Sequence, residues 1–410
     1  MALFNKKQRL WLKVLCLVYA LLFFYCQYRS ARDPTSYFFQ PEEGYRPRYS
    51  VTRIQESLRF LSSSKHLSVR PASLSTDPSL CVGIVTTKRP LAQNLNTTVG
   101  SLLDNLSQEQ RSDIAVHVLF AHVISSAHPD FGQPWVSQFV DRAFTYEQLG
   151  APIPTLKKLE HERRISEKSL LDYRLTLESC YNQTNSSWIL MLEDDVVAQR
   201  HWYERTAQAL QTVYKWEKQG KIRRWLYLRL FYTEKFLGWN VEDWPVYLAW
   251  SIFAISTTAV LGICARQQVH SWQGVLANSF LVVVCFIGVP LGILIYFLAG
   301  RMTVQPMRPG VHLMNRHGCC SQALLFPREL VPLVSSYLDW KRCASPGPVD
   351  SVMEMLGDQG GLDRLAISPS LMQHVGAASY KENRPSYQWE GMYSVHGAHG
   401  VWNVEFEGQS

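Results

Sequence analysis

The segment Trp188-Ile189-Leu190-Met191-Leu192-Glu193-Asp194-Asp195 joins an apolar run of strand length to three adjacent carboxylates. Such a run predicts a buried strand that delivers the three carboxylates to one edge of a sheet. Neighbouring negative charges at that edge need a cation, and carboxylate oxygens are ligands that hard metal ions prefer. The alternative is a strand that runs into an exposed acidic turn, since short motifs also match by chance.

The composition indicates a large and rather apolar chain. Its 410 residues suffice for one large domain or two ordinary ones, and 18% of them are charged while 47% are hydrophobic. The net charge of +7 is spread along the chain, with neither zinc-finger spacing nor a recognition-helix signature. We therefore expect no nucleic acid partner, whereas an anionic substrate and a membrane surface both fit the basic balance.

Three apolar segments predict membrane spans, because each has the length of about 20 residues that crosses a bilayer. They cover residues 10–28, 244–264 and 279–299, and the last two carry no charge. Lys6, Lys7 and Arg9 precede the first span and favour an uncleaved anchor that begins in the cytosol. A cleaved signal peptide is the alternative, and both place residue 30 onward in the lumen.

The spans divide the chain into an expected order of segments. These are a cytosolic tail at 1–9, the anchor at 10–28, a lumenal stem at 29–79, the first part of a globular domain at 80–243, the span at 244–264, a cytosolic turn at 265–278, the span at 279–299, the second part of the domain at 300–380 and a tail at 381–410. Strand-like segments occur on both sides of the two later spans, so we expect this transmembrane hairpin to interrupt one domain. Two unrelated lumenal domains are the alternative.

Four N-glycosylation sequons fall in the first predicted lumenal region, which agrees with this topology. They begin at Asn96, Asn105, Asn182 and Asn185.

Five cysteines would lie in the oxidising lumen, where disulfides persist. They are Cys81, Cys180, Cys319, Cys320 and Cys343. Because five is odd, at least one stays free or pairs elsewhere. A disulfide between adjacent residues is strained, so we expect Cys319 and Cys320 to bond to two different partners. The pairing itself cannot be derived from the sequence.

Strand-like and helix-like segments alternate along the predicted domain. Strands are expected near 81–87, 115–123, 188–193, 225–232 and 323–326, and helices near 51–61, 160–181 and 200–218. This order is typical of an α/β sandwich with a largely parallel sheet. Ligands of such sheets gather at the carboxyl ends of the strands, where both the acidic triplet and the turn Thr86–Arg89 would lie.

The turn offers candidates for binding an anionic nucleotide. Lys88 and Arg89 are suited to pyrophosphate or uracil, the alternative being that they are solvated charges, as lone basic residues in a turn more often are. Thr86 and Thr87 are candidates for hydrogen bonds to the base, the alternative being that they cap the turn.

The triplet itself can serve a metal and a ribose together. Alternation along an extended chain would place Glu193 and Asp195 on one side and Asp194 on the other. We assign Asp195 to a divalent metal, either Mn²⁺ or Mg²⁺, and Glu193 to the ribose. Asp194 would contact either the transferred sugar or the residues that surround the metal ligands. His374 is a candidate for a further metal ligand, the alternative being a structural histidine.

Asp350 is the candidate catalytic base that would take a proton from an acceptor hydroxyl, with Asp194 as the second candidate for the catalytic set. Asp350 follows Pro346-Gly347-Pro348 at the start of an expected helix, so an N-cap role is the alternative.

Together these stretches resemble the Golgi enzymes that add N-acetylgalactosamine (GalNAc) to glycosylphosphatidylinositol (GPI) anchors, the post-GPI-attachment GalNAc-transferases. The resemblance covers about residues 80–380. It is carried by Ile84-Val85-Thr86, Asp172-Tyr173 with Leu177-Glu178-Ser179, Ile189–Asp195, Leu226-Tyr227-Leu228-Arg229-Leu230, Cys319-Cys320 with Ala323-Leu324-Leu325-Phe326-Pro327, Cys343 with Asp350, and His374-Val375-Gly376 with Ser379.

The resemblance implies a GT-A fold interrupted by the transmembrane hairpin, in a multi-pass Golgi membrane protein with a lumenal catalytic domain. It also implies a metal-dependent hexosyltransferase with UDP-GalNAc as donor and Mn²⁺ as cofactor. The implied reaction is an inverting β1,4 transfer to the first mannose of GPI, so the implied partners are GPI-anchored proteins or the GPI glycolipid, and membrane lipids.

Two features depart from that family. Cys81 and Cys180 do not lie where its cysteines are expected, and the tail beyond Tyr380 has no counterpart. The alternative enzyme is a Golgi N-acetylglucosaminyltransferase acting on N-glycans, and the alternative from another class is a non-catalytic membrane scaffold.

Overall fold

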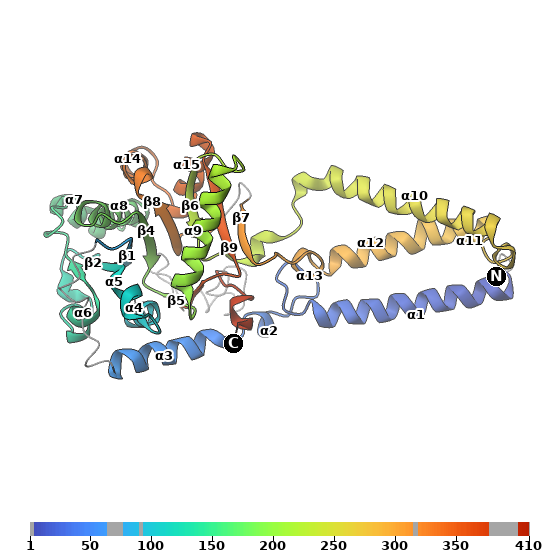
Figure 1. The fold of residues 1–410 in the computed structure, drawn as a ribbon, viewed down its shortest axis with the longest axis horizontal. Helices are drawn as coiled ribbons and strands as arrows, with labels where there is room; N and C mark the ends of the chain where they lie inside the picture. Colours follow the sequence, from blue (N-terminus) through green and yellow to red (C-terminus); the bar gives the residue numbers. More distant parts are fainter. Residues whose placement is uncertain (1–3, 64–76, 90–92, 315–318, 377–400, 410) are drawn as a thin grey trace. The chain divides into compact units, whose positions relative to one another are not determined.

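A computed structural model of the chain describes residues 4–63, 77–89, 93–314, 319–376 and 401–409 (Figure 1). The chain forms two compact units. The helical unit comprises Met1–Tyr45 and Glu234–Met307, and the sheet unit comprises Arg46–Thr233 and Arg308–Ser410.

The sheet unit is built on one mixed eight-stranded sheet with the order β3-β2-β1-β4-β8-β6-β9-β7. Its strands are β1 Leu80–Thr86, β2 Ile114–Phe120, β3 Arg142–Phe144, β4 Trp188–Glu193, β6 Trp225–Arg229, β7 Gly310–Leu313, β8 Ala323–Pro327 and β9 Asp363–Ser368. Strand β8 runs antiparallel between β4 and β6, and β7 runs antiparallel to β9. The described strands on both sides of the helical segment 234–307 therefore share one sheet.

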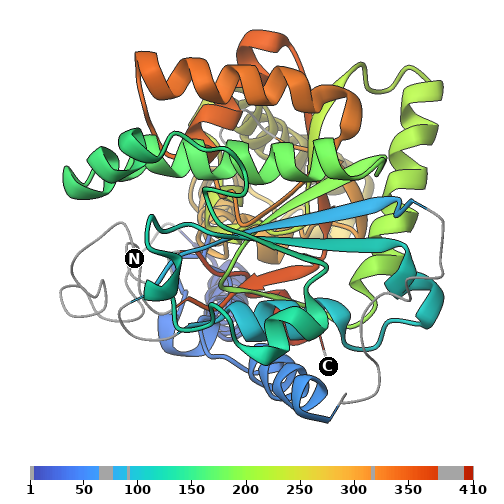
Figure 2. The same ribbon diagram turned by 90° about the vertical axis from the view of Figure 1, so that its left-hand side faces the viewer.

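Helices cover both faces of this sheet (Figure 2). They are α3 Tyr49–Ser63, α4 Leu95–Leu103, α5 Gln108–Ser112, α6 Pro134–Phe139, α7 Ile153–His161, α8 Ile165–Gln183, α9 Trp202–Lys218, α14 Val331–Ala344 and α15 Val349–Gly360. Alternate residues of a strand enter different cores: Ile84 packs with α4 and α9, whereas Cys81 packs with α8, α14 and α15. This two-sided burial explains why the strands read as continuous apolar runs.

The helix expected over 160–181 is two helices in the structure. α7 ends at His161 and α8 begins at Ile165. Arg163 between them has a positive φ of 53°, which no helix can accommodate, so the apolar spacing continues across a break in the backbone. The strand expected over 225–232 ends earlier, at Arg229.

Arg53 fastens α3 to the sheet unit from within the expected stem. Its guanidinium is fully buried, donates to the carbonyls of Ala198 and Ser101, and pairs with Asp104 at 2.7 Å. These contacts join α3 to α4 and to β5 Val196–Ala198, so α3 belongs to the core of this unit.

The disulfides differ from the expectation for the adjacent cysteines. Cys319 and Cys320 are bonded to each other, and their Cα atoms are 3.7 Å apart. Cys320 adopts a φ of 96°, and this left-handed turn brings the two side chains together. Such a backbone conformation cannot be predicted from the cysteine spacing. Cys81 pairs with Cys180, and Cys343 is an exposed free thiol.

We expect removal of the Cys81–Cys180 disulfide by the double change Cys81→Ala and Cys180→Ala to lower the free energy of unfolding by about 3–5 kcal/mol. The bond joins β1 to α8 across 99 residues of chain, and a long closed loop restricts the unfolded chain most. The measurement is the denaturant midpoint of the purified protein. Cys343→Ala, at an exposed free thiol, is the matched control, and an equal shift in both proteins would contradict the prediction.

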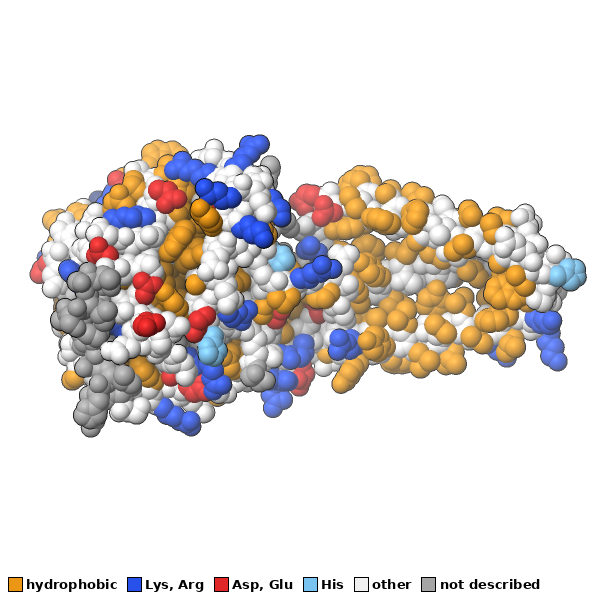
Figure 3. Space-filling model, in the orientation of Figure 1, with side chains coloured by type: hydrophobic (Ala, Val, Ile, Leu, Met, Phe, Trp, Pro, Cys, Tyr) orange, Lys and Arg blue, Asp and Glu red, His pale blue; other side chains and the backbone are white. Residues whose placement is uncertain are grey.

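The helical unit contains three helices long and apolar enough to cross a membrane, which indicates a membrane protein. They are Lys6–Arg29 (α1), Glu234–Gln268, which includes α10 Trp244–Gln268, and Asn278–Leu298, which includes α11 Asn278–Val283 and α12 Val289–Leu298. Large apolar side chains such as Trp250, Leu261 and Phe286 are exposed on them. Figure 3 shows hydrophobic side chains along the surface of these helices. Pro290 has no N–H for the carbonyl four residues earlier, and the helix widens to a π-helix over Val284–Gly288. The short helices α2 Pro41–Gly44 and α13 Arg301–Val304 complete the unit.

Candidate active site

The acidic triplet and the turn Thr86–Arg89 emerge at the same edge of the sheet. β1 and β4 are parallel neighbours, with Val85 opposite Glu193. β1 ends at Thr86 and β4 ends at Glu193, so the residues that follow the two strands lie close together.

Asp194 is held by three residues of that turn. Its Oδ2 accepts hydrogen bonds from the Thr86 hydroxyl at 2.7 Å and from the Thr87 backbone N–H at 3.2 Å. Its Oδ1 accepts from Nε of Arg89 at 3.0 Å and also contacts Nη2 of the same guanidinium. The Asp194 side chain is only 3% exposed, so the turn replaces the water that a carboxylate would otherwise bind.

Asp195 faces the same guanidinium and a histidine from a distant part of the chain. Nη1 of Arg89 lies 2.9 Å and Nε2 of His374 lies 3.2 Å from Oδ2 of Asp195. β10 Met372–His374 pairs antiparallel with β5, with His374 opposite Val196, and this pairing brings the histidine to the carboxylate. Strict alternation does not separate Asp194 from Asp195, because β4 ends before them and both bind Arg89.

The four groups perturb one another's protonation. Burial raises the pKa of Asp194, against the charge of Arg89. For Asp195, burial acts in the same direction, but the charges of Arg89 and His374 outweigh it and lower the pKa. Burial would lower the pKa of His374, yet the Asp195 carboxylate raises it. The charges of Asp195 and Asp194 likewise raise the pKa of Arg89, despite its burial.

Asp195 is held mainly by charge. Its Oδ2 pairs with Arg89 and faces His374, whereas its Oδ1 and Nδ1 of His374 are buried without a hydrogen bond from the described residues. Gly376 closes the space beside Asp195 from one side, since a Cβ at that position would lie 2.0 Å from Oδ2 of Asp195. Buried acceptors of carboxylate and imidazole type fit a divalent cation such as Mn²⁺.

Glu193 connects the triplet to Asp350. Its carboxylate accepts from the Ser321 hydroxyl at 3.0 Å and from the Gln322 amide at 3.4 Å. The backbone N–H of Cys320, next to Ser321, donates to Oδ2 of Asp350 at 3.4 Å. The N-cap of α15 is Pro348, so Asp350 lies inside the first turn and the alternative N-cap role is wrong.

The family whose description is GPI-N-acetylgalactosamine transferase PGAP4 matches residues 80–373, more than half of the chain. The chain belongs to this family. Membership makes it a glycosyltransferase, an enzyme that transfers a sugar. The matched range contains the turn Thr86–Arg89, the acidic triplet and Asp350, and it ends one residue before His374.

The chain is also similar to a curated glycosyltransferase, alpha-1,3-mannosyl-glycoprotein 4-beta-N-acetylglucosaminyltransferase A from Xenopus tropicalis. The identity is 25% over 196 residues, and the match covers 41% of this chain. The chain spans only 36% of the length of that relative.

Other residues that the sequence singled out lie outside the cluster of Arg89, Asp194, Asp195 and His374. The Lys88 side chain is exposed. Asn105, Asn182 and Asn185 are exposed on the sheet unit, as glycosylation acceptors must be. Asn96 is half-buried in α4, and the hydroxyl of Thr98 in its sequon is buried, where it donates to the carbonyl of Asp194 at 2.9 Å.

Sequence reasoning about this PGAP4-family chain gave Arg229 no role. Its guanidinium is fully buried, binds Tyr227 and Glu354 at 2.9 Å each, and donates to the carbonyl of Cys319. Glu354 also pairs with Arg364 at 2.8 Å. An arginine within the otherwise apolar run 225–232 is the signal that could have revealed this network, which holds the carbonyl of Cys319 in the loop before β8.

The C-terminal residues of the tail support His374. The Gln373 side chain donates to the carbonyl of Asn403 at 2.8 Å and to Glu407 at 2.9 Å, and accepts from the Asn403 N–H at 3.0 Å. Glu407 also binds the backbone N–H of Ser50 at 3.1 Å. Residues 401–409 thus fix β10, although the sequence offered no role for them; Ser379 and residues 381–400 lie outside the described residues.

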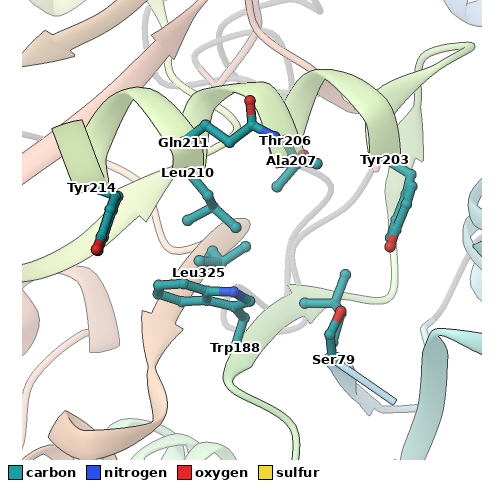
Figure 4. A pocket seen from close by; sticks show the side chains of 10 residues that line it. Ser79, Trp188, Tyr203, Thr206, Ala207, Leu210, Gln211, Tyr214 and Leu325 are labelled. Atoms are coloured by element: carbon teal, nitrogen blue, oxygen red, sulfur yellow. The ribbon is translucent and has the colours of Figure 1, made fainter. Parts of the chain in front are cut away.

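A pocket of about 370 Å³ lies under α9, away from this cluster (Figure 4). It is lined by Ser79, Leu80, Trp188, Tyr203, Thr206, Ala207, Leu210, Gln211, Tyr214 and Leu325. Trp188 begins β4, whereas Glu193 ends it, so this pocket lies toward the opposite edge of the sheet from the acidic triplet.

Proposed function

We propose that the sheet unit is a GT-A-like domain that transfers GalNAc from UDP-GalNAc to the first mannose of GPI in β1,4 linkage with inversion. The observation that carries the proposal is the meeting of Asp194, Asp195 and His374 around Arg89, beside a turn that offers backbone and hydroxyl donors. A cationic side chain and a carboxylate-rich edge suit a nucleoside diphosphate with its metal ion.

Within this proposal Asp195 and His374 would hold Mn²⁺, with Mg²⁺ as the alternative. The ion, when bound, would neutralise charge on the leaving diphosphate. Arg89 would pair with a diphosphate oxygen, Glu193 would accept hydrogen bonds from the ribose, and Thr87 and Lys88 would contact the nucleotide. Asp194 holds Arg89 and Thr86 in place and would contact the sugar.

Asp350 would act as the base of a single displacement. It would take the proton of the acceptor hydroxyl while that oxygen bonds to the anomeric carbon and the bond from this carbon to the diphosphate breaks. One such displacement converts an α-linked donor into a β-linked product. Asp350 is half-buried on the first turn of α15, and the Cys320 N–H fixes its orientation.

We place the sheet unit in the lumen of the Golgi, with three spans in the membrane. The spans and the exposed sequons support this location. A lipid-linked acceptor lies close to the bilayer, so a catalytic domain interrupted by spans would hold its active site near that acceptor.

The proposal is tested by incubating the purified full chain with a panel of UDP-sugars and measuring released UDP, then repeating the assay with GPI glycolipid and with N-glycan acceptors. UDP-GalNAc with GPI should give the highest rate. A preference for UDP-GlcNAc and N-glycans would favour the second candidate function, which the Xenopus tropicalis relative suggests. No UDP release from any sugar would overturn both and support the scaffold.

We expect removal of divalent metal with a chelator to abolish transfer, and added Mn²⁺ to restore it, because the carboxylate of Asp195 and the imidazole of His374 are the ligands assigned to the metal. The measurement is UDP release against free metal concentration, with Mg²⁺ and Ca²⁺ compared. The melting temperature is recorded alongside. Full activity in chelator would contradict a metal role for Asp195.

A further inference from the structure

His128 lies behind the turn that holds Asp194, at a place the proposed mechanism does not use. It follows the 3₁₀ turn η1 Ser125–Ala127, which comes after β2, the strand next to β1. Its side chain is fully buried, and its Nε2 lies 2.9 Å from Oγ1 of Thr86. This buried imidazole therefore contacts the hydroxyl that binds Asp194.

The hydrogen bonds around His128 assign the position of its proton. The backbone N–H of Asp130 can only donate, and it donates to Nδ1 of His128 at 3.1 Å. Burial, assisted by the charge of Lys88, lowers the pKa of His128 to about 4, so the ring is neutral near neutral pH. A neutral ring that accepts at Nδ1 carries its hydrogen on Nε2.

This tautomer fixes the direction of each hydrogen bond in the series from His128 through Thr86 to Asp194. Nε2–H of His128 donates to the Thr86 hydroxyl, so the hydrogen of that hydroxyl is free to donate to Asp194 at 2.7 Å. Asp194, as a carboxylate, accepts there and uses its other oxygen for Arg89. A histidine that accepted from Thr86 instead would take that hydrogen away from Asp194.

A second neutral histidine holds the same turn. Nε2 of His122 accepts from the backbone N–H of Lys88 at 2.7 Å, and burial lowers the pKa of His122 to about 4. The His122 and His128 rings are 6.3 Å apart. One ring thus fixes the Thr86 side chain and the other fixes the Lys88 backbone, on either side of Thr87.

We propose that His128, as its neutral Nε2–H tautomer, is a positioning residue that orients Thr86 and Asp194 so that Arg89 is held ready for the diphosphate of a nucleotide-sugar donor. This inference rests on the proposed function and deepens it. The affinity for the donor would then depend on His128, which contacts neither the donor nor the metal. Loss of His128 should therefore weaken donor binding more than it slows turnover.

Two substitutions separate the hydrogen bonds of the ring. His128→Gln keeps an N–H donor near the position of Nε2, whereas His128→Asn keeps only the acceptor near Nδ1. Loss of one hydrogen bond corresponds to about a 3- to 10-fold effect. We expect His128→Asn to raise the KM for the donor and the Kd for UDP by that factor, with little change in kcat, and His128→Gln to stay near the unmodified protein.

His117 provides the matched control. It is equally buried, lies on β2 and bonds to the hydroxyl of Ser179 at 3.2 Å, away from the turn. His117→Asn should alter the melting temperature and leave the Kd for UDP unchanged. In a Thr86→Val background, His128→Asn should have no further effect on donor affinity, because the two residues act through one chain of hydrogen bonds.

The experiment measures UDP binding by calorimetry and donor kinetics on the full-length protein. Unchanged donor affinity in His128→Asn, or equal loss in His128→Asn and His128→Gln, would overturn the inference while the proposed function stands. Failure of the unmodified protein to bind UDP would overturn both.

Discussion

Replacing Asp195 with asparagine is expected to reduce sugar transfer by about a hundred- to a thousandfold, the effect of removing one electrostatic stabiliser from an enclosed site. The change keeps the shape of the side chain and removes the charge that Arg89 and His374 face. An amide also donates hydrogen bonds and is a weak ligand for a hard cation. Both the metal and the leaving diphosphate would lose their partner.

The fold should tolerate this substitution. Two buried carboxylates face one guanidinium, so Asp195→Asn leaves Arg89 paired with Asp194. It also removes the repulsion between the two aspartates, which offsets the loss of the ion pair between Asp195 and Arg89. The melting temperature should therefore change little while activity falls.

The measurements are UDP release, metal binding by calorimetry without donor, and thermal unfolding. Asp339→Asn is the matched control, because Asp339 is an exposed carboxylate on α14 that pairs with Arg342 and Arg174. It should leave transfer unchanged. Metal binding and transfer near the unmodified level in Asp195→Asn would show that the cation site is elsewhere.

The sequence predicted the meeting of Thr86–Arg89 with the acidic triplet because that meeting depends only on strand order and direction. Two parallel neighbours must present the residues after their ends at one edge, whatever their side chains do. The requirement for a cation also followed from the charges alone. In the structure Arg89 meets part of that requirement, because its guanidinium pairs with both Asp194 and Asp195.

Other parts of the site depend on events that no local pattern encodes. β4 ends at Glu193, so alternation fails for the next two residues. His128 reaches Thr86 from a 3₁₀ turn after the neighbouring strand, and its spacing resembles no motif. Cys319 and Cys320 meet because one backbone angle is left-handed. His374 was predicted from its residue type alone. Its position beside Asp195 depends on the pairing of β10 with β5, which is only three residues long.

Replacing Gly376 with alanine is expected to reduce transfer by about a hundredfold, by displacing the two groups that face each other beside it. The added Cβ would lie 2.0 Å from Oδ2 of Asp195, 2.9 Å from its Cγ and 3.0 Å from Nε2 of His374. Carbon and oxygen atoms that are not bonded do not approach so closely, so the carboxylate or the backbone must move by about an ångström. Misplacement of that size costs about a hundredfold where reacting groups must be aligned.

Gly408→Ala separates this steric effect from a general effect of losing a glycine. Gly408 is exposed in the same C-terminal region, and nothing lies within 4 Å of its Cβ position. It should leave transfer and the melting temperature unchanged. The assay is donor KM and kcat together with metal affinity, which should fall in Gly376→Ala because Asp195 is the group displaced.

A double change makes the argument specific to Asp195. If alanine at position 376 acts by moving that carboxylate, adding Gly376→Ala to Asp195→Asn should cost far less than adding it to the unmodified protein, because the same interaction cannot be lost twice. Independent, additive losses would instead mean that Gly376 acts through His374 or the backbone of β10. In that case the position of the Asp195 carboxylate would not be the feature that Gly376 protects.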